Sequence, residues 1–217
     1  VYKRQVQTER FAAQAAAPVP LRKRAWKQIV REKVRAQARL IRELRGDDCG
    51  LSGLANSVRS GDPDNVESQA ARRYWALLFN DPEFRRRYDA PDQNRLLNYG
   101  YAVLRAVVGR AICASGLHPS LALHHRNRYD AFCLADDLME PYRPVVDAAV
   151  VEHVGVYGRD GSLDRQAKQG LLSAIMGRYR CQGEERTLFD WVARTTSSLV
   201  KVFLGETDRL FYPEALD

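Results

Sequence analysis

The sequence has 217 residues, of which 45% are apolar and 28% are charged, an ordinary composition for a globular protein with a core of its own. Its formal charge of +7 and its pI near 9.4 favour a polyanionic partner, with nucleic acid ahead of a membrane surface. The longest apolar runs are far too short to span a bilayer, so we expect no membrane partner.

Helical periodicity recurs along the chain, whereas clear alternating β-branched runs are missing and no Asn-Gly or Asp-Gly turn joins two such runs. Pro18 and Pro20 precede the first long helix, and Gly46 follows it. The predicted helices cover residues 20–45, 54–58, 66–79, 93–115, 129–151, 163–178 and 185–204, and the fifth bends near Pro141 and Pro144. We therefore predict an all-α fold of six to eight helices.

The first predicted helix is strongly basic. Residues 21 to 45 include ten Arg or Lys and only two acidic residues. Its apolar stripe runs through Trp26, Val30 and Val34, so most of the basic side chains lie on the exposed face.

The cysteines are few and widely spaced, at Cys49, Cys113, Cys133 and Cys181. None forms a Cys-x-x-Cys pair, which argues against a zinc ribbon or a thioredoxin-type site. The spacing is not that of a disulfide framework, so we expect reduced thiols and a cytoplasmic location.

Potential metal ligands gather at three places in the sequence. Glu67 lies in the first turn of its predicted helix, His124 and His125 lie in a loop, and Asp137 and Glu140 follow in an acidic run. Residues three apart share a helix face, and two carboxylates on one face repel each other unless a cation lies between them. Carboxylates combined with an imidazole suit magnesium or manganese, which can polarise a phosphate oxygen and help to activate a hydroxyl.

Each of these groups also has a simpler interpretation. A helix N-terminus stabilises Glu67 without any metal, and an Asp-Asp-x-x-Glu run is usually a solvated helix face. However, apolar residues flank the acidic run, and an unpaired charge beside a core is costly, which favours a site. A di-iron helical bundle is a poor fit, because it requires Glu-x-x-His pairs that the sequence does not contain.

Four stretches carry a more specific pattern. In chain order they are Glu67 with Ala-Ala-Arg-Arg-Tyr-Trp at 70–75, Asn-Arg-Leu-Leu-Asn-Tyr-Gly-Tyr at 94–101, the loop 116–125 that ends in His124-His125, and Leu-Ala-Asp-Asp-Leu-Met-Glu-Pro-Tyr-Arg-Pro at 134–144. Together they resemble the motifs of CRISPR-associated protein 1. The resemblance covers residues from about 8 to 213 and, with Leu-Arg-Lys-Arg-Ala-Trp-Lys-Gln-Ile-Val at 21–30, looks most like members from type II systems.

The resemblance implies a set of site residues. The family's metal ligands, a Glu, a His and an acidic residue, correspond to Glu67, His125 and Glu140, and the ion would be Mg²⁺ or Mn²⁺. Asp137 corresponds to a further acidic position that assists catalysis. His125 fits the family spacing to Asp137 better than His124, which remains an alternative.

The resemblance also implies a function and partners. The family inserts short double-stranded DNA fragments as new spacers into a CRISPR array, by attack of a terminal 3′ hydroxyl on a repeat phosphodiester. CRISPR-associated protein 2, a second copy of the family member and, in type II systems, the effector nuclease are the expected protein partners. Candidates for DNA contacts are basic side chains, Arg72, Arg73, Arg85, Arg86, Arg87, Arg126 and Arg128.

The start of the chain departs from the family pattern. Family members carry an N-terminal β-rich domain that builds the homodimer, and here the sequence starts at Val1 without methionine, a leader or that domain. We expect a fragment, with residues 1–19 as an N-terminal remnant or linker and residues 20–217 as the helical catalytic domain.

Three alternatives remain open at this stage. The first is a related integrase of a mobile element, the second is a nuclease that resolves branched DNA, and the third is a basic helical module that binds nucleic acid without catalysis. Alanine at Glu67 separates the third alternative from an integrase. An integrase should lose strand joining and keep DNA binding, whereas a pure binding module joins no strands with or without Glu67.

Overall fold

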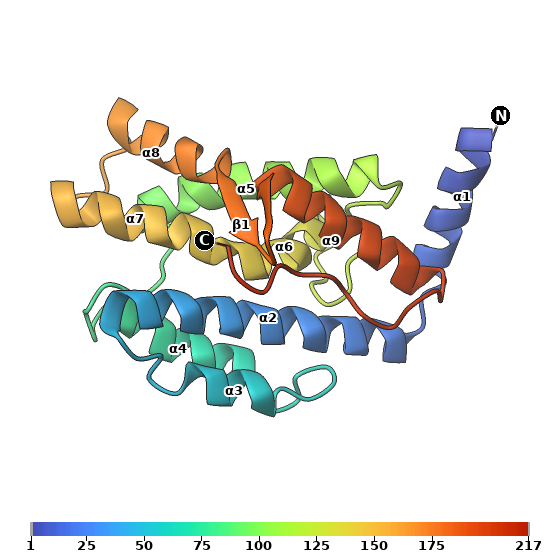
Figure 1. Cartoon of the computed structure of the whole chain (residues 1–217), viewed down its shortest axis with the longest axis horizontal. Coiled ribbons are helices and arrows are strands. Elements are labelled where there is room, and N and C mark those ends of the chain that lie inside the picture. Colours follow the sequence, from blue (N-terminus) through green and yellow to red (C-terminus); the bar gives the residue numbers. More distant parts are fainter. Residues whose placement is uncertain (1, 217) are drawn as a thin grey trace.

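The computed structural model describes residues 2–216 and is built almost entirely of helices (Figure 1). The elements in chain order are α1 (Tyr2–Ala15), α2 (Val19–Arg45), α3 (Leu51–Ser57), α4 (Val66–Leu78), α5 (Asn94–Ala114), α6 (Cys133–Met139), the 3-10 helix η1 (Glu140–Tyr142), α7 (Arg143–Tyr157), α8 (Arg165–Ile175), β1 (Arg178–Cys181), β2 (Glu184–Thr187) and α9 (Leu188–Phe203). The predicted all-α class is confirmed. None of the described helices has the length and apolar character needed to cross a membrane.

The long helix α2 organises the fold (Figure 1). It packs against α3 and α4 on one side and against η1 and α7 on the other, and α5, α8 and α9 complete the larger layer. Trp26, Ile29 and Ile41 of α2 are at most 1% exposed. Fully burying each such side chain stabilises a fold by roughly 1.5–3 kcal/mol, so α2 is the central element of the core.

The helix expected at 129–151 is divided into α6, η1 and α7. Pro141 lies in the first turn of η1 and Pro144 in the first turn of α7, where a missing backbone N–H costs little. Neither proline could lie inside one continuous helix without removing a hydrogen bond. The division places Glu140 at the junction between α6 and α7.

Two features differ from the sequence analysis. Residues 2–15, expected as a remnant or linker, form helix α1, while the division into domains stays a prediction. An antiparallel hairpin, β1–β2, follows α8 and includes residue 178 and residues 185–187, which were expected to be helical. Helix α9 therefore begins only at Leu188. The turn residues of the hairpin, Gln182 and Gly183, both have positive φ, the geometry of a type I′ turn, here made by Gln-Gly rather than Asn-Gly.

Candidate active site

Glu67 is positioned by the loop that leads into α4. The carboxylate of Asp62 accepts hydrogen bonds of 2.9 Å from the backbone N–H groups of Val66 and Glu67. These bonds satisfy two of the free donors at the helix N-terminus and fix the first turn of α4. The Glu67 side chain is left 24% exposed and reaches toward α2.

Glu140, the first residue of η1, is almost fully buried at 3% exposure. Its Oε1 lies 2.9 Å from Nη2 of Arg143, one turn further along the chain. Burial alone would raise the pKa of the Glu140 carboxyl, but the charges of Arg143 and Lys33 outweigh burial and hold that pKa below its ordinary value. Glu140 is therefore an ionised carboxylate at neutral pH.

Lys33 of α2 joins the two glutamates. Its Nζ lies 2.6 Å from Oε1 of Glu67 and 2.6 Å from Oε2 of Glu140. Burial lowers the pKa of the Lys33 ammonium, but the charges of Glu140 and Glu67 more than offset burial, so the pKa is raised above its ordinary value. Two carboxylates that are far apart in sequence thus meet on one positive charge.

Asp137 holds the histidine loop in place. Its fully buried carboxylate accepts hydrogen bonds from the backbone N–H groups of Leu123, His124 and His125, at 2.7, 3.0 and 3.3 Å. Its Oδ1 also lies 2.6 Å from Nδ1 of the His125 ring. This hydrogen bond raises the pKa of His125 above its ordinary value despite burial, and the charges of Glu140 and Glu67 raise it further. Asp137 therefore orients His125.

The two histidines have different surroundings. The His124 ring stacks on Trp26 with ring centres 4.2 Å apart and an interplanar angle of 1°. The His125 ring meets Trp26 edge-on, with its Nδ1 on Asp137, so Nε2 is the nitrogen left for an ion. A metal-bound histidine usually donates its other ring nitrogen to a carboxylate, and His125 has this arrangement.

The donors fit a divalent ion in kind, although their present spacing is not that of a bound site. Within residues 2–216, no three His, Cys, Asp or Glu side chains are already spaced as ligands of one ion. Two carboxylates nevertheless converge on a cation, and an oriented imidazole lies close enough for their charges to raise its pKa. Oxygen donors with one imidazole suit Mg²⁺ or Mn²⁺. The assignment of Glu67, His125 and Glu140 as ligands stays a prediction.

Comparison with known proteins decides the family. The model of the family described as CRISPR associated protein Cas1 matches residues 2–157, well over half of the chain. The chain belongs to the Cas1 family. The CRISPR-associated endonuclease Cas1 of Neisseria meningitidis serogroup C (strain 8013) is 38% identical over 194 residues, which cover 88% of this chain and 62% of that protein. The resemblance found in the motifs is confirmed.

Solved structures share the fold. A casposase bound to integration product superposes with a TM-score of 0.77 at 20% identity, covering 94% of this chain and 71% of the casposase chain. A partial Cas6-RT-Cas1–Cas2 complex contains a chain with a TM-score of 0.77 at 16% identity, covering 98% of this chain and 75% of that one. The chain itself spans about three fifths of the length of the Neisseria Cas1.

The predicted DNA-contacting arginines divide into three groups. Arg126 and Arg128 are exposed and line a cavity of about 620 Å³ together with His125 and Arg22. Arg72 and Arg73 are exposed on α4, the helix that begins beside Glu67, and Arg73 donates to the carbonyl of Cys49 at 3.0 Å. Arg126 and Arg128 therefore lie beside His125, whereas Arg72 and Arg73 lie on the helix that carries Glu67.

The run of arginines at 85–87 is used differently. Arg86 donates to the side-chain oxygens of Asn94 and Asn98 at 2.9 and 2.6 Å and lies over the Tyr101 ring. Arg85 donates to backbone carbonyls of its own loop, and Arg87 is exposed. Arg86 is thus half-buried, and its hydrogen bonds connect the loop between α4 and α5 to α5 itself. Arg87 remains accessible to a DNA phosphate.

Sequence reasoning did not single out Lys33 or Arg143, the two cations that contact Glu140. Lys33 lies two turns after Trp26, on the buried stripe of α2, and a charge on an apolar stripe was the available signal. Asp136, the neighbour of Asp137, pairs instead with Arg105 at 2.7 Å, on the surface side of α6.

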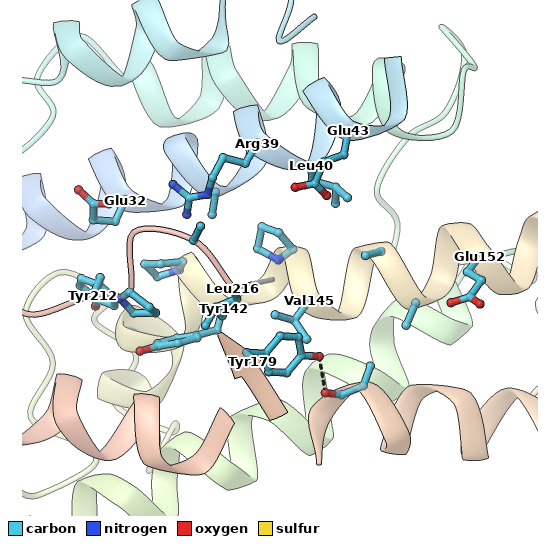
Figure 2. Close-up of a pocket in the computed structure, with 18 residues that line it drawn as sticks. Glu32, Arg39, Leu40, Glu43, Tyr142, Val145, Glu152, Tyr179, Tyr212 and Leu216 are labelled. Atoms are coloured by element: carbon cyan, nitrogen blue, oxygen red, sulfur yellow. Dashed lines mark hydrogen bonds between the residues drawn. The ribbon is translucent and has the colours of Figure 1, made fainter. Parts of the chain in front are cut away.

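A separate cavity of about 280 Å³ lies between α2, α7 and the C-terminal segment (Figure 2). It contains neither Glu67, His125 nor Glu140. Its walls include Pro141 and Tyr142, the residues that follow Glu140 in η1, and Tyr142 donates to or accepts from Thr195 at 2.6 Å. The cavity therefore adjoins the candidate site through η1 without being part of it.

Proposed function

We propose that this chain is the helical catalytic part of a divalent-metal-dependent DNA integrase that inserts short double-stranded fragments as spacers into a CRISPR array. Membership of the Cas1 family and 38% identity to a CRISPR-associated endonuclease support the proposal. The structural observation that carries it is the meeting of Glu67 and Glu140 on one cation, with His125 oriented beside them by Asp137.

Glu67, His125 and Glu140 would hold Mg²⁺ or Mn²⁺, which supplies charge stabilisation at the phosphate and favours the deprotonated hydroxyl. Asp137 keeps the His125 ring in one orientation and one tautomer, which leaves Nε2 as the ring nitrogen available to the ion. Arg126 and Arg128 bind DNA phosphates beside His125 and position the scissile strand without reading its sequence. Attack by the 3′ hydroxyl on a phosphodiester conserves the bond energy, and the reaction requires no ATP.

The partners follow from the same assignment. Two similar solved structures are complexes that contain Cas2, which supports CRISPR-associated protein 2 as a partner. A second copy of the Cas1 protein and the type II effector nuclease are further expected partners. The site of action would be the cytoplasm, where the array is located.

Glu67→Gln is the decisive variant, assayed in the chain together with Cas2. Removing the charge while keeping the shape should abolish strand joining of a fragment with a free 3′ hydroxyl and leave DNA affinity within about twofold. Glu152→Gln, at an exposed position on α7, is the matched control and should join strands normally. Full joining by Glu67→Gln would reject Glu67 as a ligand of the catalytic ion, and no joining by any form would favour a DNA-binding module.

The likeness to a casposase keeps a mobile-element integrase as a second candidate, because both reactions would use the same fold. A target that carries a repeat beside a leader, compared with a target of random sequence, separates the two. Insertion confined to the repeat boundary supports spacer acquisition, and equal insertion into both targets supports the mobile-element function.

A further inference from the structure

Lys33 occupies an unusual place for a lysine. It is 8% exposed, on the buried stripe of α2, between two carboxylates that belong to other elements. Burying an ammonium is costly unless it is paired and hydrogen-bonded, and here the two ion pairs at 2.6 Å provide that compensation. The two ion pairs therefore stabilise both the buried ammonium of Lys33 and the close approach of the two glutamates.

The same face of α2 reaches every segment that carries a candidate ligand. Lys33 contacts Glu67 of α4 and Glu140 of η1, while Trp26, two turns earlier, contacts the adjacent rings of His124 and His125. One helix thus sets the relative positions of the three predicted ligands, and Lys33 lies at the point where the two acidic ligands meet.

No other cation joins these glutamates in the described part of the chain. Arg143 forms an ion pair with Glu140 but not with Glu67. Within residues 2–216, Glu67 forms its ion pair with Lys33. Without Lys33 or a replacement cation, two carboxylates would face each other in a largely buried space, where like charges repel strongly.

We propose that Lys33 is a resident cation of the metal site, which holds Glu67 and Glu140 together until a divalent ion binds and displaces its ammonium. This inference rests on the proposed function, because it assumes that the two glutamates are metal ligands. The ammonium and the ion compete for the same two carboxylates, so metal binding is weaker than the bare ligands would allow. However, Lys33 keeps the two carboxylates close together before the ion arrives.

Chemical labelling of the unaltered chain tests the displacement directly. Lys33 should react slowly with an amine-acetylating reagent in the absence of divalent ions, because its ammonium is buried and paired. Saturating Mn²⁺ should increase acetylation of Lys33 about tenfold or more, measured by peptide mass spectrometry. The exposed Lys168 and Lys201 are internal controls whose labelling should not change.

Mn²⁺ affinity, measured by calorimetry or electron paramagnetic resonance, provides the second test. Lys33→Met removes the competing cation and should tighten Mn²⁺ binding by about tenfold or more. Lys201→Met removes the same charge from an exposed position on α9 and should change the affinity less than twofold. The labelling experiment needs no variant, so the test stands even if Lys33→Met fails to fold.

The outcomes separate this inference from the function beneath it. If Glu67→Gln weakens Mn²⁺ binding while Lys33 stays protected at saturating Mn²⁺, the metal site is correct and the displacement is wrong. Unchanged or weaker Mn²⁺ binding by folded Lys33→Met would also overturn the displacement. If the unaltered chain and Glu67→Gln bind Mn²⁺ equally, both the metal site and the inference are wrong.

Discussion

Tyr74, two turns after Glu67 on α4, donates a hydrogen bond of 2.6 Å to the buried carboxylate of Asp147 on α7. Tyr101 of α5 donates to the other oxygen of the same carboxylate, and its ring lies 4.8 Å from the guanidinium carbon of Arg143. Because Arg143 pairs with Glu140, this network connects α4, which carries Glu67, with the segment that carries Glu140. A substitution at Asp147, Tyr74 or Tyr101 should therefore disturb the packing of the helices that position the candidate site.

Loss of the Tyr74 hydroxyl should destabilise the fold. Tyr74→Phe leaves one oxygen of a fully buried carboxylate without its donor, which typically costs about 1–3 kcal/mol of unfolding free energy. Urea unfolding followed by circular dichroism measures the change. Tyr129→Phe, at a position that is 87% exposed, should change stability by less than about 0.5 kcal/mol. Equal stability of the two variants would mean that the Tyr74 hydrogen bond contributes nothing.

Asp147 should make stability fall as pH rises. Burial raises its pKa from 3.8 to about 6, although the hydrogen bonds from Tyr101 and Tyr74 act in the opposite direction. The folded chain therefore binds a proton more tightly than the unfolded chain. The resulting stabilisation is fully present below pH 3.8, is lost as pH rises through about 6, and amounts to roughly 3 kcal/mol.

Asp147→Asn isolates this effect, because the amide keeps the shape and cannot ionise. The unfolding free energy of the unaltered chain, minus that of Asp147→Asn, should decrease from pH 4 to pH 7. Urea titrations across this range measure the difference. A constant difference would show that Asp147 titrates normally in the folded chain.

Asp137 should control metal affinity without being a ligand. Asp137→Asn weakens the bond to Nδ1 of His125 and replaces one acceptor of the loop N–H groups with a donor. Loss of such a supporting carboxylate typically lowers metal affinity about 10–100-fold. Mn²⁺ titration measures the loss, with Asp136→Asn as the control because Asp136 pairs with Arg105 on the other side of α6. Comparable losses in both variants would indicate a general effect of charge.

The sequence predicted the helical class well, because apolar periodicity and proline positions are local signals. It could not predict the hairpin, because each strand is only four residues long, β2 has no apolar alternation, and the turn is Gln182-Gly183. The motifs identified the candidate ligands, but the role of Lys33 depends on α4 and η1 packing against α2, a long-range contact that no local pattern encodes. Arg86 illustrates the same limit, because the basic run predicts a DNA contact and gives no sign that its guanidinium donates to Asn94 and Asn98, one turn apart on α5. The DNA contact of Arg86 stays a prediction.

Salt dependence should distinguish the arginines that contact DNA from the one that fastens a loop. If Arg126 and Arg128 each neutralise a phosphate, their joint replacement by alanine removes two ionic contacts. The slope of log affinity against log salt should then become shallower by about 1.8, because each contact with duplex DNA contributes about 0.9. Fluorescence anisotropy of labelled duplex DNA, titrated with NaCl, measures the slope.

Arg86→Ala is the control. It should leave this slope unchanged and lower the unfolding free energy instead, because the Arg86 guanidinium donates to Asn94 and Asn98. An unchanged slope in the double variant would remove the cavity beside His125 from the DNA path.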